Sequence, residues 1–145
     1  MNRLITVLSL VMALVTYAEA DSKVVLSRAG APLQTTIPGS FNTLQSILPA
    51  LFSLADQAAD KSAEQVFVGG RKKHKDLIFY YRGVRVVDDV VIVSFSKEAM
   101  PYFSGPVSYD ATVMRSLVGT VMLYQPNAKD VKLEIDGKPW KNSDA

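Results

Sequence analysis

The clearest pattern of hydrophobic and polar positions lies near the C-terminal end of the chain, at residues 131–135. Valine, leucine and isoleucine alternate there with lysine and glutamate. A period of two is typical of a strand with one face buried and one face in water. Asp136 and Gly137 follow directly, and this pair is a strong turn signal. The pattern predicts a half-buried strand that ends in a tight turn.

Two other segments carry apolar residues at helical spacing. Residues 111–123 place valines and leucines three and four positions apart, after Ser108 as a candidate N-cap. Residues 41–58 have a broader apolar face that is interrupted by Pro49. Either this helix kinks at the proline, or it begins near Leu48 with the proline in its first turn. Both segments predict helices that pack against a sheet.

Residues 77–95 read as a β-hairpin. Two runs rich in valine and aromatic residues flank Asp88 and Asp89, which are turn candidates. Gly83 lies inside the longer first run and predicts a bulge that bends the strand. Ser96 follows the hairpin as a candidate N-cap for a short helical turn.

With a strand at residues 23–28, the elements follow the order β-α-β-β-α-β. This order predicts an α+β fold of the split-βαβ type. We expect a small antiparallel or mixed sheet with two helices on one face and an open second face. Tyr80, Arg82, Arg85 and Lys132 are expected on that open face.

The N-terminus predicts a secretory signal peptide over residues 1–20. Asn2 and Arg3 precede an apolar run, and a small-x-small step ends at Ala20. The alternative is a membrane anchor, but a spanning helix needs roughly 20 apolar residues and this run is shorter. We expect cleavage after Ala20, a single domain over residues 21–140, and a polar tail over residues 141–145.

Composition narrows the class of protein. The chain has no cysteine, which excludes a disulfide scaffold and the thiol that anchors bacterial lipoproteins. Stability must therefore come from an apolar core, which a chain of 145 residues can form. The formal net charge of +2 is too small to argue for nucleic acid. A periplasmic or secreted protein, not membrane-spanning after signal cleavage, fits these features.

Three segments of the second half resemble the sporulation and germination (GerMN) domain. They are VRVVDDVVIVSFSKE at 84–98, the helix at 111–123 with its SLVGTV step, and VKLEIDGKP at 131–139. Their order and spacing are similar to the hairpin, helix and closing strand of that family. The resemblance implies an envelope-facing interaction module without catalytic residues. Two departures are the missing lipoprotein cysteine and the single copy, and the region before Gln65 matches only loosely.

The residues offer little for catalysis. His74 is the only histidine, which excludes a multi-histidine metal site and a Cys-His dyad. A general-base role for His74 beside Asp76 is an alternative to a solvated polar loop, and we favour the loop. Asp88 and Asp89 point to opposite faces if they lie in a strand, and turn chemistry explains them. We expect no catalytic residues, no metal and no cofactor.

The candidate binding residues are basic, and three further residues are expected to have structural roles. The predicted basic patch consists of Arg71, Lys72, Lys73, Lys75, Arg82 and Arg85. The structural residues are Ser96 as a cap, with Asp136 and Gly137 as a turn. A charge run is usually a solvated loop, but this one could also face an anionic partner. The expected function is non-enzymatic binding of an envelope protein or cell-wall polymer, and not of nucleic acid, through the open sheet face and the basic loop. The alternative is a small secreted inhibitor or ligand carrier, ahead of a hydrolase.

Overall fold

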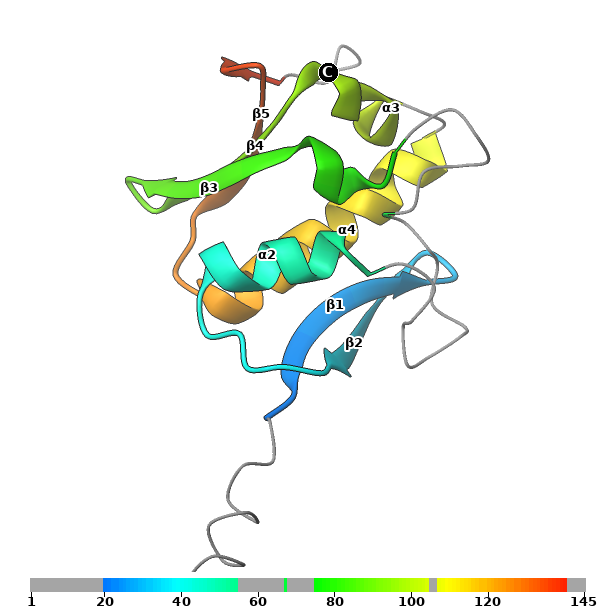
Figure 1. The fold of residues 1–145 in the computed structure, drawn as a ribbon, viewed down its shortest axis with the longest axis vertical. Coiled ribbons are helices and arrows are strands. Elements are labelled where there is room, and N and C mark those ends of the chain that lie inside the picture. The colour runs from blue at the N-terminus through cyan, green and yellow to red at the C-terminus, as the bar shows by residue number, and fades with distance from the viewer. Residues whose placement is uncertain (1–19, 55–66, 68–74, 105–106, 141–145) are drawn as a thin grey trace, which may run out of the picture.

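The computed structural model describes residues 20–54, 67, 75–104 and 107–140, with only the backbone described for residues 107–111. Three layers are visible in Figure 1: a two-stranded hairpin, a pair of helices and a four-stranded sheet. The predicted α+β fold class is confirmed. Among the helices that the structure describes, none has the length and apolar character needed to cross a bilayer.

The first layer is the hairpin of β1 (Ser22–Arg28) and β2 (Ala31–Ile37). Ala29 and Gly30 join the two strands with φ angles of 48° and 78°, so they form a two-residue turn of the type that suits the twist of a hairpin. The sequence predicted that the first strand joins the main sheet, and this placement is wrong. The short turn pairs β1 with its own neighbour, and α4 (Val107–Tyr124) packs along it.

The middle layer contains α2 (Leu44–Phe52) and α4. Thr43 is the N-cap of α2: its hydroxyl accepts a hydrogen bond from the Ser46 N–H, and the Ser46 hydroxyl accepts one from the Thr43 N–H. The helix starts before Leu48 and continues through Pro49, so the later start is wrong. The predicted helix at residues 111–123 is confirmed as the main part of α4.

The third layer has the strand order β3-β4-β5-β6, where the strands are β3 (Tyr81–Val87), β4 (Val90–Phe95), β5 (Asp130–Ile135) and β6 (Lys138–Pro139). The neighbours β4 and β5 are parallel and the other two pairs are antiparallel, so the sheet is mixed. The predicted hairpin is confirmed over residues 81–95 and not at residues 77–80, and the pairing shifts register between Tyr81 and Gly83, as a bulge requires. Three short elements complete the fold: η1 (Leu77–Tyr80), η2 (Lys97–Ala99) and α3 (Met100–Phe103).

Aromatic rings hold the helical layer to the sheet. Phe95 of β4 lies 5.4 Å from Phe52 of α2 and 5.1 Å from Phe103 of α3, measured between ring centroids. Phe67 contacts Phe52 at 5.6 Å. Such pairs add to the hydrophobic stabilisation of the core. One face of the sheet is therefore buried against the core, and the other face is not part of this aromatic packing.

Candidate functional site

The outer face of the sheet is the surface that the sequence predicted to stay open. Burial alternates along β4: Val91 and Val93 are fully buried, whereas Ile92 and Ser94 are half-buried and belong to the opposite face. Strand register places Arg85 of β3 and Lys132 of β5 on either side of Ile92. We use the name outer face for the surface formed by Arg85, Val87, Val90, Ile92, Ser94, Lys132 and Glu134. The open face predicted from the sequence is confirmed.

Arg85 and Glu134 form a two-point ion pair on the outer face. The guanidinium donates from Nη1 to Oε1 at 3.1 Å and from Nη2 to Oε2 at 2.6 Å. The hydroxyl of Ser94, on the strand between them, donates to Oε1 at 3.1 Å. The hydrogen bonds from Arg85 are the main reason that the pKa of Glu134 lies below its usual range. Arg85 is therefore paired with Glu134 of the same chain. The sequence prediction had grouped Arg85 with the basic patch.

The other basic residues occupy different positions. Lys75 places its ammonium 5.6 Å from the centre of the Phe79 ring, a cation–π contact with a side chain that is 60% exposed. Arg82 lies at the bulge of β3 and is exposed. Arg71, Lys72, Lys73 and His74 lie outside the described residues.

Tyr80 does not lie on the outer face, which corrects the sequence prediction. It belongs to η1, before the sheet begins, and its hydroxyl accepts a hydrogen bond from the Lys75 N–H at 3.0 Å. Of the four residues of η1, Leu77 is fully buried in the core, Ile78 and Tyr80 are half-buried, and Phe79 is exposed.

The cap that the sequence assigned to Ser96 is supplied by another residue. Ser96 occupies the N-cap position of η2, but its side chain makes no capping hydrogen bond. Asp136 reaches over from the end of β5, and its Oδ1 accepts the Lys97 N–H at 2.9 Å. Asp136 and Gly137 have φ angles of 49° and 76° and connect β5 to β6, so their predicted turn is confirmed.

The Asp88-Asp89 step also forms a turn. Its φ angles of 51° and 62° connect Val87 directly to Val90. The Asp89 carboxylate lies 3.5 Å from the Lys129 ammonium, and the Asp89 carbonyl accepts the Lys129 N–H at 2.8 Å. These contacts give the two residues a structural role. In the part of the chain that the structure describes, no three carboxylate or histidine side chains group as metal ligands would.

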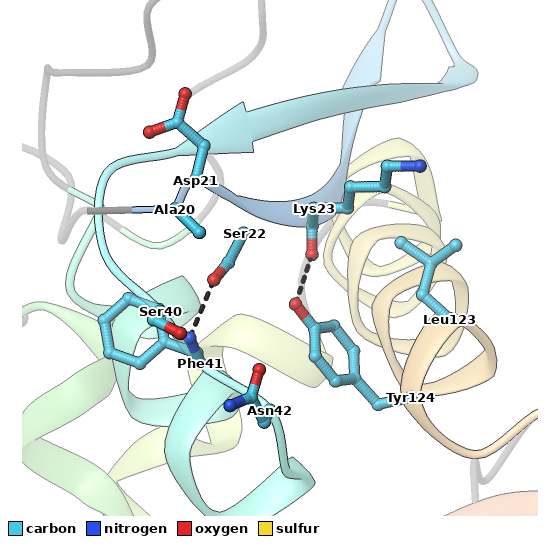
Figure 2. A pocket seen from close by; sticks show the side chains of 9 residues that line it. All are labelled: Ala20, Asp21, Ser22, Lys23, Ser40, Phe41, Asn42, Leu123 and Tyr124. Carbon is cyan, nitrogen blue, oxygen red and sulfur yellow. Dashed lines mark hydrogen bonds between the residues drawn. The ribbon is translucent and has the colours of Figure 1, made fainter. Parts of the chain in front are cut away.

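A pocket of about 470 Å³ opens beside the start of β1, and the sequence had not predicted it. Figure 2 shows its lining, which comes from three separate parts of the chain: Ala20, Asp21, Ser22, Lys23, Ser40, Phe41, Asn42, Leu123 and Tyr124. No local pattern identifies such a site, because it exists only where the hairpin, the loop before α2 and the end of α4 meet.

Hydrogen bonds hold the pocket walls in position. The Ser22 hydroxyl donates to the Gly39 carbonyl at 2.5 Å and accepts the Phe41 N–H at 2.8 Å, which ties the loop to β1. The Tyr124 hydroxyl donates to the Lys23 carbonyl at 2.9 Å, which ties the end of α4 to the same strand (Figure 2). Burial is the main reason that the pKa of Tyr124 lies above its usual range.

Comparison with known proteins concerns the second half of the chain. Residues 80–141 match Germane, a family described as sporulation and spore germination. The similarity to this family covers the main sheet and α4. The predicted resemblance to the sporulation and germination domain is confirmed. No curated protein and no solved structure matches the chain.

The Germane match begins at the last residue of η1 and includes all four strands of the main sheet and α4. The outer face, the Arg85–Glu134 pair and both aspartate turns lie inside it. The β1–β2 hairpin and α2 lie before the matched residues. The pocket combines Leu123 and Tyr124, which lie within the matched residues, with seven residues that precede them.

Proposed function

We propose that this protein is a non-enzymatic binding module of the cell envelope, which recognises a protein partner or a cell-wall component through the outer face of the Germane sheet. The observation that carries the proposal is the outer face itself. It is a folded sheet surface, with Arg85, Val87 and Lys132 exposed, within the residues that match a sporulation and spore germination family.

The chemistry of the outer face suits recognition. Ile92 and Val87 supply apolar area, and Val87 is 47% exposed. Lys132 supplies an exposed positive charge beside them. The Arg85–Glu134 pair is already ordered, so a partner would not have to immobilise these two long side chains on binding. A mixed surface of this kind resembles the apolar centre and polar rim of protein interfaces.

A non-enzymatic role is supported by the contacts of Asp88 and Asp89. This pair is the one adjacent carboxylate pair in the chain, and a turn and a contact with Lys129 account for it. The basic run in the sequence at residues 71–75 would add a second, electrostatic contact with an anionic partner. The signal peptide predicted at residues 1–20 supports a periplasmic or secreted location.

Site-specific photo-crosslinking in intact cells tests this function. A photoreactive amino acid replaces Lys132 on the outer face in one variant and Gln34, exposed on β2, in a matched control. We expect an envelope protein or wall fragment to be captured from position 132, less efficiently at high salt, and not from position 34. Equal capture from both positions, or capture from neither, would contradict a role for the outer face.

A further inference from the structure

The pocket beside β1 has aromatic walls. Phe41 and Tyr124 lie on either side of it, and Leu123 continues the apolar surface next to Tyr124 (Figure 2). The Ser22 hydroxyl accepts the Phe41 N–H and the Lys23 carbonyl accepts the Tyr124 hydroxyl, so the Phe41 backbone and the Tyr124 side chain are tied to the same strand. The pocket is therefore largely formed before any ligand arrives, which lowers the entropic cost of binding.

Neutral polar groups complete the lining. Within the described part of the chain, the side chains of Ser40 and Asn42 make no hydrogen bond, so one hydroxyl and one amide are available to a ligand. The Tyr124 hydroxyl donates a hydrogen bond to the Lys23 carbonyl, and its oxygen keeps a lone pair that can accept a hydrogen bond. Ser22 already uses its hydroxyl as donor and acceptor.

The two charged side chains of the lining stand at its rim. In Figure 2 the Asp21 carboxylate and the Lys23 ammonium point away from the space between Phe41 and Tyr124. The lining thus offers two aromatic side chains, an amide and hydroxyl groups, and its two charged side chains point elsewhere.

We propose that this pocket binds a neutral sugar ring. A pyranose has C–H groups on its faces, which pack on aromatic side chains, and hydroxyl groups at its edge, which pair with amides and hydroxyls. The volume of about 470 Å³ falls within the range of small-molecule sites, which is roughly 300–1,000 Å³. Phe41 and Tyr124 supply the ring contacts, while Asn42 and Ser40 supply the polar contacts.

The sugar site is separate from the outer face. In Figure 1 the start of β1 and the sheet formed by β3, β4 and β5 lie on opposite sides of the helical layer. The two sites share no residue, so a variant of one leaves the other intact. Loss of partner capture at Lys132 and loss of sugar binding are therefore distinguishable results.

The test is a titration of the isotope-labelled full chain, followed by the backbone amide signals in nuclear magnetic resonance. The probes are triacetylchitotriose, which carries acetamido groups, and maltotriose, which carries hydroxyls alone. We expect saturable shifts at residues 22–23, 40–42 and 123–124, all of which follow the predicted cleavage after Ala20. Asn42→Ala should raise the dissociation constant about tenfold, which is the effect of losing one good hydrogen bond.

Leu123 and Met122 provide a matched control pair, because both are 38% exposed and only Leu123 lines the pocket. Leu123→Ser should weaken sugar binding, whereas Met122→Ser should not. Binding of triacetylchitotriose alone would indicate an amino-sugar ligand, and binding of both probes a general glycan; either result supports the proposal. No saturable shift with either probe, equal loss in the two serine variants, or tighter binding of acetate or glycine than of sugar would overturn it.

Discussion

At the scale of single residues, pairs with positive φ determine where this chain reverses direction. Ala29-Gly30, Asp88-Asp89 and Asp136-Gly137 each join two antiparallel strands with a two-residue loop. Most side chains disfavour this left-handed region, whereas glycine, asparagine and aspartate tolerate it. The three turns set the register of the strands on both sides of them.

Replacing Gly137 tests the importance of this backbone conformation. Gly137 has φ of 76°, and a Cβ atom there would meet no other atom within 4 Å, so the cost of a side chain is conformational. We expect Gly137→Val to lower the free energy of unfolding by about 1–2 kcal/mol or more, measured by denaturant titration. Gly137→Asn is the control, because asparagine tolerates positive φ. Equal stability of the glycine and valine proteins would contradict this role of the turn.

At the scale of elements, the contact of β1 with α4 decides how the two halves of the chain assemble. A Cβ atom at Gly119 would lie only 2.6 Å from Cγ1 of Val25, so the helix and the strand approach closely because position 119 is glycine. Beside it, the Thr120 hydroxyl accepts the Val25 N–H at 2.9 Å and donates to the Val25 carbonyl at 3.3 Å.

Two further bonds continue this contact along the strand. Arg115 donates to the Ser27 hydroxyl at 3.1 Å, and Tyr124 donates to the Lys23 carbonyl. Two residues of a strand span about 6.6 Å, and the four and five residues that separate the helix positions span about 6 and about 7.5 Å. Every second residue of β1 (Lys23, Val25 and Ser27) therefore meets a successive turn of α4.

Removing the Thr120 hydroxyl tests this contact. Thr120→Val keeps the shape of the side chain but leaves the buried Val25 N–H without its partner. We expect the free energy of unfolding to fall by about 1–3 kcal/mol, measured by thermal or denaturant unfolding. Thr120→Ser retains the hydroxyl and should lose less. A valine variant as stable as the parent would show that the hydroxyl does not support the docking of β1.

At the scale of the whole molecule, the Arg85–Glu134 pair connects the first and third strands of the Germane sheet across β4. Because Arg85 lowers the pKa of Glu134, the pair stabilises the fold above the pKa of an unfolded glutamate. This contribution is lost as the pH falls through the lower folded-state pKa. The Arg85 side chain is 50% exposed, so we expect a modest effect.

A pH series measures this effect. Between about pH 5 and pH 3 the melting temperature of the parent should fall more steeply than that of Glu134→Gln. Asp130→Asn, on the same strand and at an exposed position, is the control and should keep the slope of the parent. Identical slopes for the parent and Glu134→Gln would show that the ion pair does not contribute to acid sensitivity.

Local patterns of the sequence determined most of the Germane half. The strand at residues 131–135, the helix at residues 111–123, the bulge at Gly83 and the Asp136-Gly137 turn were all predicted correctly. Each of them depends on hydrophobic periodicity or on the turn preferences of adjacent residues. Such information lies within a few positions along the chain and can be read without a structure.

Tertiary structure alone decided the remaining features. Arg85 meets Glu134 across 49 positions of sequence, Asp136 caps Lys97 across 39, and Thr120 docks on Val25 across 95. The pocket likewise gathers residues from three distant segments. Periodicity shows that a side chain is buried or exposed, but it does not specify which distant group lies opposite. Whether Arg85 offers a free charge, whether β1 joins the main sheet and whether a pocket forms therefore depend on how the layers pack.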